Sequence, residues 1–430
     1  MMEFKPTAYT LQSCASKREF ADSGWMLADK EDSSPAFVRA IYQNKQINFK
    51  DNSYGIYKFA DWLPIHKMLE GSCAPVTYKS EGLANKLGLS NLYITFSGWW
   101  PEKGATMQTC SFKETEAYSV CARLPKDNDK ILVVASAGNT ARAFAKVCSE
   151  NNIPIVIAIP YDNLNALWFK EPLNDCVKII CSPANTDYFD AIALAAKLNS
   201  SSKFIEEGGA KNVARRDGMG TTVLSAAEHI GRIPDSYFQA IGSGTGTIAA
   251  YEANLRLIED GRFGNHLMKL IPSQNLPFVP MYDAWKADSR ALLIADEDKA
   301  REDALKITAK VLSNRKPPYG IVGGLYDCLK ATNGDIEVVT NEELDNACKL
   351  FEEIEGSDIH PAAGVAVCSL IKAVESGKVS KDEVIMLNIT GGGEKRFKNE
   401  HKCIEVKPHL VIDAATSAED VCAAVEGLFE

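Results

Sequence analysis

The sequence predicts an α/β protein with two open, twisted and mostly parallel sheets that are flanked by helices. Two observations support this fold class. Short apolar runs alternate with amphipathic segments over residues 130–390, and strands that alternate with helices form parallel sheets. Glycine-rich turns follow several of these apolar runs. Open parallel sheets bind ligands at the carboxyl ends of their strands, so these turns are where we expect a site.

The apolar runs predict the strands in chain order. A first βαβ unit is expected at residues 131–159, because two apolar runs flank a segment with apolar residues at helical spacing. The same pattern predicts the elements that follow: a strand at 177–180, a helix at 188–198, a strand at 238–241, a helix from Thr247, a strand at 268–271, a helix at 342–353 and a strand at 384–389. The charged, alanine-rich stretch 283–309 predicts one solvated amphipathic helix.

Three unlike regions predict the domain organisation of the 430 residues. Residues 1–95 mix short strands, turns and aromatic residues, and we expect them to form an N-terminal extension. The rhythm of strands and helices then predicts a small α/β domain at 126–205. The remaining residues, 96–125 and 206–430, form the larger domain.

Composition excludes several classes of protein. The net charge of −10 argues against nucleic acid or an anionic membrane as the main partner. No stretch approaches the ~20 apolar residues of a membrane span, and the first residues lack the order of a signal peptide, so we expect a cytoplasmic protein. The 12 cysteines form no CxxC pair, so we expect no metal site. Cys110 is the cysteine closest to the predicted site. We expect His66, His229, His266 and His360 to be packing or surface residues, and a place of Glu355 and His360 at the border of the site stays open as the alternative.

Lys113 precedes three glycine-containing turns that together indicate a cofactor. The turns lie at residues 135–140, 242–247 and 390–393. An aldehyde cofactor such as pyridoxal phosphate needs a lysine amine for its aldehyde, backbone amides for its phosphate and a partner for its ring nitrogen. We therefore predict that pyridoxal phosphate binds to Lys113, although a lone lysine in a mixed segment is usually a solvated surface charge.

The turn at 242–246 is predicted to bind the cofactor phosphate. It lies between a strand and a helix, where glycines let the backbone approach an anion and the helix start presents N–H groups to it. Two alternatives stay open, namely a tight turn that binds nothing and a dinucleotide fingerprint, whose spacing fits poorly. The expected phosphate ligands are Gly242, Ser243, Gly244, Thr245 and Gly246.

Five further side chains complete the predicted site. Asn139 is expected to donate to the phenolic oxygen of the cofactor and also to cap its helix, while Ser136 and Thr140 hold a substrate carboxylate. Thr390 is expected to bond the pyridine nitrogen, unless its glycines form a plain strand-end turn. Arg215 is expected to bind a substrate phosphate through its fork of N–H groups, and a surface ion pair with Asp217 is the alternative.

In this order the motifs resemble the fold-type-II pyridoxal-phosphate enzymes, and within them the threonine synthase group. The resemblance covers residues 50–400, and two upstream segments, 57–64 and 82–93, also look like those of the group. It implies a fold like that of the tryptophan synthase β chain, a catalytic lysine at Lys113 and assembly of identical chains. The segments that match the group are 111–113, 136–140, 242–247 and 390–391.

The chain departs from this group around the lysine. Glu114 and Thr115 follow Lys113 where the group usually has Asp and Arg, and residues 95–104 replace its usual approach to the lysine. Related chains often begin with a four-cysteine ribbon, of which only Cys14 survives here. The cofactor motifs persist, so the chain most resembles a branch with the same cofactor and a neighbouring reaction. That branch replaces the phosphate of O-phosphoserine with sulfite and gives L-cysteate for coenzyme M synthesis.

Three other functions stay open at this point. The first is the threonine synthase reaction, which acts on O-phosphohomoserine and water. The second is another β-replacement or dehydratase reaction on the same fold. The third belongs to a different class of protein, a non-catalytic α/β protein that binds a nucleotide at residues 242–246.

Overall fold

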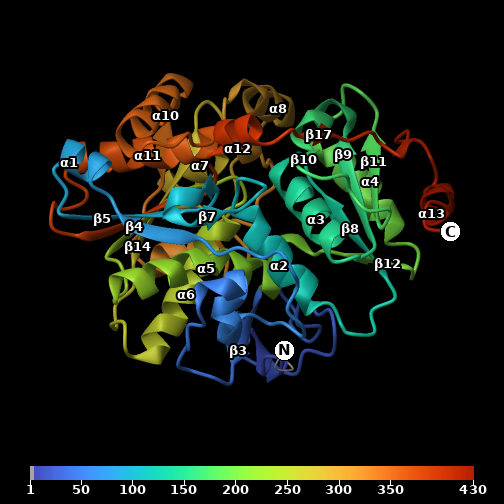
Figure 1. The fold of residues 1–430 in the computed structure, drawn as a ribbon, viewed down its shortest axis with the longest axis horizontal. Coiled ribbons are helices and arrows are strands. Elements are labelled where there is room, and N and C mark those ends of the chain that lie inside the picture. The colour runs from blue at the N-terminus through green and yellow to red at the C-terminus, as the bar shows by residue number, and fades with distance from the viewer. Residues whose placement is uncertain (1–3) are drawn as a thin grey trace.

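Two open sheets form the framework of the protein in the computed structural model, which describes residues 4–430 (Figure 1). In the larger sheet, neighbouring strands run parallel except at one edge, where β4 pairs antiparallel with β5. Its strands in spatial order are β15 (Glu337–Val339), β14 (Lys269–Asn275), β13 (Ser236–Ala240), β16 (Val384–Ile389), β5 (Asn91–Phe96) and β4 (Val76–Lys79). The predicted fold class is confirmed.

The smaller sheet is parallel throughout. It lies beside the larger sheet and is drawn mainly in green in Figure 1. Its strands in spatial order are β12 (Phe204–Glu206), β8 (Ile131–Ala135), β9 (Ile155–Pro160), β11 (Val177–Ser182) and β18 (Leu410–Val411). Every residue of β9 and β11 is buried, as expected for strands that helices cover on both faces.

Helices cover the sheets, and their apolar faces form the cores. Above and below the larger sheet, one core includes Phe351 and Leu370, and the other includes Leu224 and Leu257. The helices are α1 (Gly82–Leu87), α2 (Lys113–Arg123), α3 (Asn139–Glu150), α4 (Tyr188–Leu198), α5 (Val213–Ile230), α6 (Thr245–Asp260), α7 (Pro280–Lys286), α8 (Glu297–Lys306), α9 (Leu325–Ala331), α10 (Asn341–Glu355), α11 (Pro361–Glu375), α12 (Glu394–Glu400) and α13 (Ala418–Glu426).

Three short sheets complete the framework. The N-terminal residues form an antiparallel sheet in which β1 (Tyr9–Ser13) lies between β2 (Glu19–Phe20) and β3 (Val38–Tyr42). The other two sheets are two-stranded. They pair β6 (Trp99–Trp100) with β7 (Ala105–Thr106), and β10 (Trp168–Phe169) with β17 (Ile404–Glu405).

The sheets place two segments on the other side of the predicted domain boundaries. Strands β4 and β5 fall within the range 1–95 that was predicted as an extension, yet they form one edge of the larger sheet. The C-terminal segment crosses to the smaller sheet, where β18 pairs with β11 and α13 lies at the far end of the molecule (Figure 1). Such crossings leave no signal in local periodicity, and the division into domains stays a prediction.

The prediction of one helix over residues 283–309 is wrong. The chain forms α7 and α8 there, with an irregular segment between them. Asp288 has a positive φ of 50°, a conformation that a helix interior does not contain. Asp296 then starts α8 by accepting a hydrogen bond from the Lys299 amide at 2.9 Å. The break at Asp288 and the helix cap at Asp296 therefore divide a stretch that its uniform charge pattern had predicted as one helix.

Residues 4–430 contain no candidate membrane span and no candidate metal cluster. None of the helices described there is long and apolar enough to cross a membrane. The described residues also contain no group of three or more His, Cys, Asp or Glu side chains that could hold a metal ion. Cys14 is buried, and Lys17 donates from Nζ to the Cys14 carbonyl at 2.7 Å.

Candidate active site

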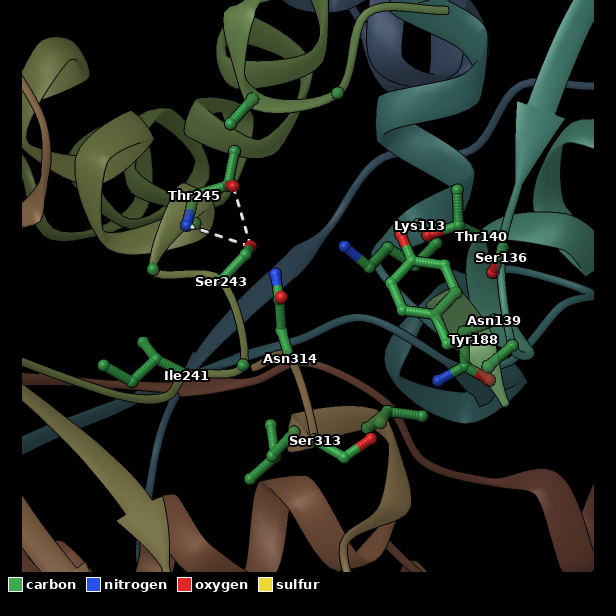
Figure 2. A pocket seen from close by; sticks show the side chains of 18 of the residues that line it. Lys113, Ser136, Asn139, Thr140, Tyr188, Ile241, Ser243, Thr245, Ser313 and Asn314 are labelled. Atoms are coloured by element: carbon green, nitrogen blue, oxygen red, sulfur yellow. Dashed lines mark hydrogen bonds between the residues drawn. The ribbon is translucent and has the colours of Figure 1, made fainter. Parts of the chain in front are cut away.

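A cavity of about 670 Å³ contains all the residues that the sequence predicts as a site. Its walls come from both sheets, so residues far apart in the chain face one another across it (Figure 2). Lys113 and Asn139 lie on one side of the view, and Ser243 and Thr245 lie on the other. The predicted residues that line the cavity are Lys113, Ser136, Asn139, Thr140, Arg215, Gly242, Ser243, Gly244, Thr245, Gly246 and Thr390.

Backbone contacts place Lys113 beside the end of β16. The Phe112 amide donates to the Thr390 carbonyl at 2.9 Å, and the Gly392 amide donates to the Cys110 carbonyl at 3.1 Å. Cys110 has a positive φ of 53°, so the chain turns there, shortly before α2 begins at Lys113. These contacts fix Lys113 at the carboxyl edge of the larger sheet, next to Thr390.

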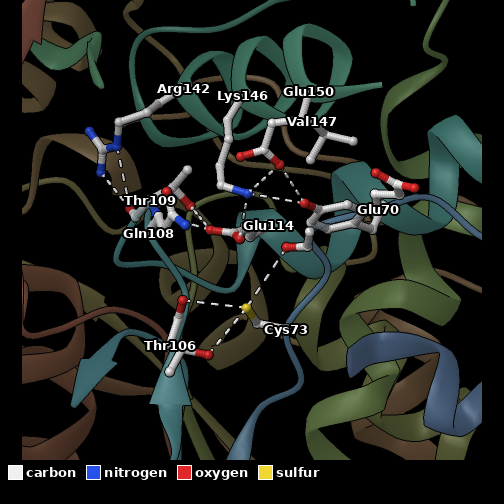
Figure 3. Close-up of polar contacts among 12 residues, drawn as sticks. Glu70, Cys73, Thr106, Gln108, Thr109, Glu114, Arg142, Lys146, Val147 and Glu150 are labelled. Atoms are coloured by element: carbon white, nitrogen blue, oxygen red, sulfur yellow. Dashed lines mark hydrogen bonds and ion pairs between the residues drawn. The ribbon is translucent and has the colours of Figure 1, made fainter. Parts of the chain in front are cut away.

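Glu114 binds the same loop through Thr109 (Figure 3). Its buried carboxylate accepts hydrogen bonds from the amide and the hydroxyl of Thr109, at 2.9 and 2.8 Å. Its other oxygen lies 3.3 Å from Nζ of Lys146. The residue that departs from the threonine synthase pattern directly after the lysine is therefore an anchor of the lysine loop.

The environment of Lys113 favours the neutral form of its amine. Its side chain is 21% exposed, and Nζ lies 3.1 Å from Oε2 of the fully buried Glu116. Burial lowers the pKa of Lys113, while the charge of Glu116 opposes this effect. A lowered pKa increases the fraction of the neutral amine, which is the form that bonds to an aldehyde or takes a proton.

Arg215 is held at the cavity wall by two carboxylates. Its Nε donates to Oε1 of Glu207 at 2.9 Å, and Nη2 forms an ion pair with Oε1 of Glu116. Arginine has five N–H groups, so N–H groups remain for an anion in the cavity. The alternative of an ion pair with Asp217 is wrong, because Asp217 instead bonds Tyr42 and Arg256.

The turn between β13 and α6 has the features of a phosphate site. Gly244, with φ of 77°, stands at the start of α6 and has no side chain to cap the helix. The Thr245 amide donates to Oγ of Ser243 at a long 3.4 Å, and the Gly246 and Thr247 amides that follow it in the first turn are available to an anion. A Cβ on Gly242 would lie 2.8 Å from the Val311 carbonyl, and one on Gly246 would lie 2.4 Å from the Gln239 side chain. Glycine is therefore required for this backbone path.

Asn139 faces the cavity from the start of α3, but it does not cap this helix as predicted. Gly138 occupies the cap position, and Oδ1 of Asn139 accepts a hydrogen bond from Nη2 of Arg142 at 2.9 Å. Because its oxygen is engaged, the amide nitrogen is the group left to donate to a ligand. Ser136 accepts from the Gly138 amide at 3.1 Å, which orders the same turn.

Arg142 connects three parts of the site. Its buried guanidinium donates to Asn139 and also to the Thr109 carbonyl, at 3.0 Å from Nη2 (Figure 3). Nη2 also lies 3.7 Å from Oε2 of Glu394, which follows the glycines after Thr390. One side chain therefore fixes the Asn139 turn, the lysine loop and the segment after β16 relative to one another.

The sequence did not reveal several residues that line the cavity. Tyr188 was interpreted only as the start of a helix, and Ser313 and Asn314 belong to an irregular segment without periodicity (Figure 2). His360, for which a packing role and a place at the border of the site both stood open, lines the cavity, with Nε2 at 3.0 Å from Oε2 of Glu394. Cys110 is buried and, within the described chain, is not one of the cavity-lining residues.

These groups fit pyridoxal phosphate. The cavity combines a buried amine at Lys113, uncapped helix amides at Gly244, an amide donor at Asn139 and a hydroxyl residue at Thr390. Each matches one part of the cofactor, namely the aldehyde, the phosphate, the phenolic oxygen and the ring nitrogen. The individual contacts of these residues with the cofactor stay predictions.

Comparison with known proteins gives the class. Residues 102–391 match the family model described as pyridoxal-phosphate dependent enzyme. Threonine deaminase isoform 2 from Solanum lycopersicum has the same fold, with a TM-score of 0.55 and 16% identity over 76% of this chain and 86% of that chain. Maize serine racemase also has this fold, with a TM-score of 0.57 and 14% identity over 76% of this chain and 91% of that chain. The fold and the cavity thus define a fold-type-II pyridoxal-phosphate enzyme.

More similar relatives give the family. The cysteate synthase of Methanosarcina acetivorans is 47% identical over 92% of this chain and 94% of its own length. The cysteate synthase of Methanosarcina mazei is 47% identical over 96% of this chain and 98% of its own length. The cysteate synthase of Methanocella paludicola is 45% identical over 97% of each chain. The chain belongs to the cysteate synthase family. The alternative of a non-catalytic nucleotide-binding protein is wrong.

Proposed function

We propose that this chain converts O-phospho-L-serine and sulfite to L-cysteate and phosphate. The observation that carries the proposal is its similarity to cysteate synthases over nearly the whole of both chains. The reaction breaks the bond from the β-carbon to the phosphate oxygen and forms a bond from the β-carbon to sulfur. With bisulfite as the nucleophile, hydrogen phosphate leaves and the charges balance.

Lys113 is the base in this proposal. Bound pyridoxal phosphate supplies the electron sink that makes the α-proton of an amino acid acidic. The amine of Lys113 takes this proton, and its lowered pKa suits the task. Phosphate then leaves the β-carbon, sulfite adds there, and Lys113 returns the proton to the α-carbon.

Other residues bind and orient the reactants. The amides of residues 242–246 would hold the cofactor phosphate, and Asn139 and Thr390 would bind its ring. The turn that contains Ser136 and Thr140 presents helix amides and hydroxyls to the substrate carboxylate, and Arg215 receives the leaving phosphate. The hydroxyl of Thr390, unlike a carboxylate, would not hold a proton on the ring nitrogen, and this would favour loss of a β-substituent over transamination.

Three features of the proposal rest on the resemblance or on composition alone. These are a role of the product in coenzyme M synthesis, assembly of identical chains and a cytoplasmic location. Each stays a prediction.

Phosphate release from two substrates tests the proposed function. The protein, loaded with pyridoxal phosphate, is incubated with O-phosphoserine or O-phosphohomoserine, each with and without sulfite. We expect sulfite-dependent release from O-phosphoserine, because the family reaction uses this shorter chain. Threonine formed from O-phosphohomoserine, with O-phosphoserine inert, would instead make the chain a threonine synthase. Protein from which the cofactor has been removed is the control and should release no phosphate.

A further inference from the structure

Glu116 lies outside the cavity lining and takes no part in the proposed reaction as described above. It follows Lys113 by three residues on α2, so the two side chains lie on the same face of the helix. Its side chain is fully buried. A buried carboxylate costs free energy unless it is paired, and both oxygens of Glu116 face cations.

The two oxygens contact two different residues of the site. Oε2 lies 3.1 Å from Nζ of Lys113, and Oε1 pairs with Nη2 of Arg215 on α5. Arg215 is in turn held by Glu207, whose pKa burial raises. Tyr188 on α4 also faces this cluster. The four charged side chains are those of Lys113, Glu116, Arg215 and Glu207, and their charges alternate in sign. Glu116 thus connects the predicted base to the predicted phosphate ligand.

In a β-replacement, the base has to keep the proton that it takes from the α-carbon. The proton that leaves the α-carbon must return to it after phosphate has left and sulfite has added. Lys113 therefore has to remain an ammonium through the exchange, in a setting where burial favours the neutral amine. A carboxylate at 3.1 Å supplies the charge that keeps this proton in place.

We propose that Glu116 is a positioning residue, which holds the protonated amine of Lys113 through Oε2 and fixes Arg215 through Oε1 where phosphate leaves. The proposal rests on the proposed function for the role of the proton. The contact with Lys113 itself belongs to the protein without cofactor or substrate. The contact can therefore be tested separately.

The test measures the pKa of Lys113 in cofactor-free protein. The rate at which formaldehyde and a mild reductant methylate Lys113 is followed against pH by mass spectrometry of its peptide. We expect Glu116→Gln to lower this pKa by about one unit or more, a tenfold change in protonation, because the adjacent charge is lost. In the loaded enzyme we expect phosphate release from O-phosphoserine to fall on the order of a hundredfold.

Two further variants make the result decisive. Glu207→Gln removes the other carboxylate that holds Arg215 without touching Lys113, so it should shift the pKa less. Glu116→Asp keeps the charge but draws it back from Lys113 by one methylene, so it should lower the pKa less than Glu116→Gln does. If Glu116→Gln does not fold, Glu116→Asp is the test, and a pKa of Lys113 equal to that of the wild type in this variant overturns the proposal. An unchanged pKa in folded Glu116→Gln, or an equal shift in Glu207→Gln, overturns the proposal. Because no substrate is used, absence of cysteate synthesis would count against the proposed function and not against this contact.

Discussion

Replacement of Lys113 by alanine is expected to abolish phosphate release from O-phosphoserine and the visible absorbance of the bound cofactor. The loss of turnover should be on the order of a thousandfold or more, because the variant lacks both the amine that bonds the aldehyde and the base. Absorbance spectra and phosphate release by the variant, prepared with excess pyridoxal phosphate, check this result.

Lys372→Ala is the matched control for this substitution. Lys372 is also a partly buried lysine in an ion pair, with Glu343, but it lies on α11 outside the cavity lining. We expect it to keep the visible absorbance and turnover. Turnover that survives in Lys113→Ala would show that another group is the base and would overturn the assignment of Lys113.

Substitution of Gly244 by valine is expected to weaken cofactor binding about a hundredfold or more. The φ of 77° at Gly244 is strained for a β-branched residue, and its Cβ would lie 3.1 Å from Leu325. Relief of this strain moves the first-turn amides of α6 away from the phosphate. A strain of about 3 kcal/mol corresponds to this change in affinity. Titration of the cofactor-free variant with pyridoxal phosphate measures it.

The other end of the same helix provides the control. Gly261 follows α6 with φ of 80°, and nothing lies within 4 Å of its Cβ position. Gly261→Val therefore carries similar backbone strain without a contact at the cavity, and it should lower the melting temperature but keep the affinity for the cofactor. If folded Gly244→Val binds pyridoxal phosphate as the wild type does, the turn at 242–246 is not the phosphate site.

Local sequence signals predicted the parts of the site that depend on the backbone. The turns at 136–140 and 242–246 were recognisable because glycine and small polar residues follow buried strands, and such turns lie at the ligand-binding edge of a parallel sheet. The strand at 384–389 and the helix at 188–198 have the predicted bounds. Because the cavity lies at this edge of the sheet, the residues of these turns were predicted as site residues, and they line the cavity.

The sequence did not predict which side chains of the site pair with one another. Glu116 and Arg215 are separated by about a hundred residues, and no periodicity indicates that α2 and α5 bring them together. The same holds for Asn139, whose oxygen bonds Arg142 rather than a helix amide. An expectation based on capping preference fails at a site because a nearby guanidinium competes for the same oxygen.

Sulfite with a labelled sulfur atom tests the central claim most directly. The protein, loaded with pyridoxal phosphate, is incubated with O-phosphoserine and labelled sulfite, and the products are identified by mass spectrometry. The account predicts labelled L-cysteate in an amount equal to the phosphate released, with neither product formed by Lys113→Ala. Phosphate released together with pyruvate and ammonia, without label in any amino acid, would show elimination instead of replacement and would contradict the account.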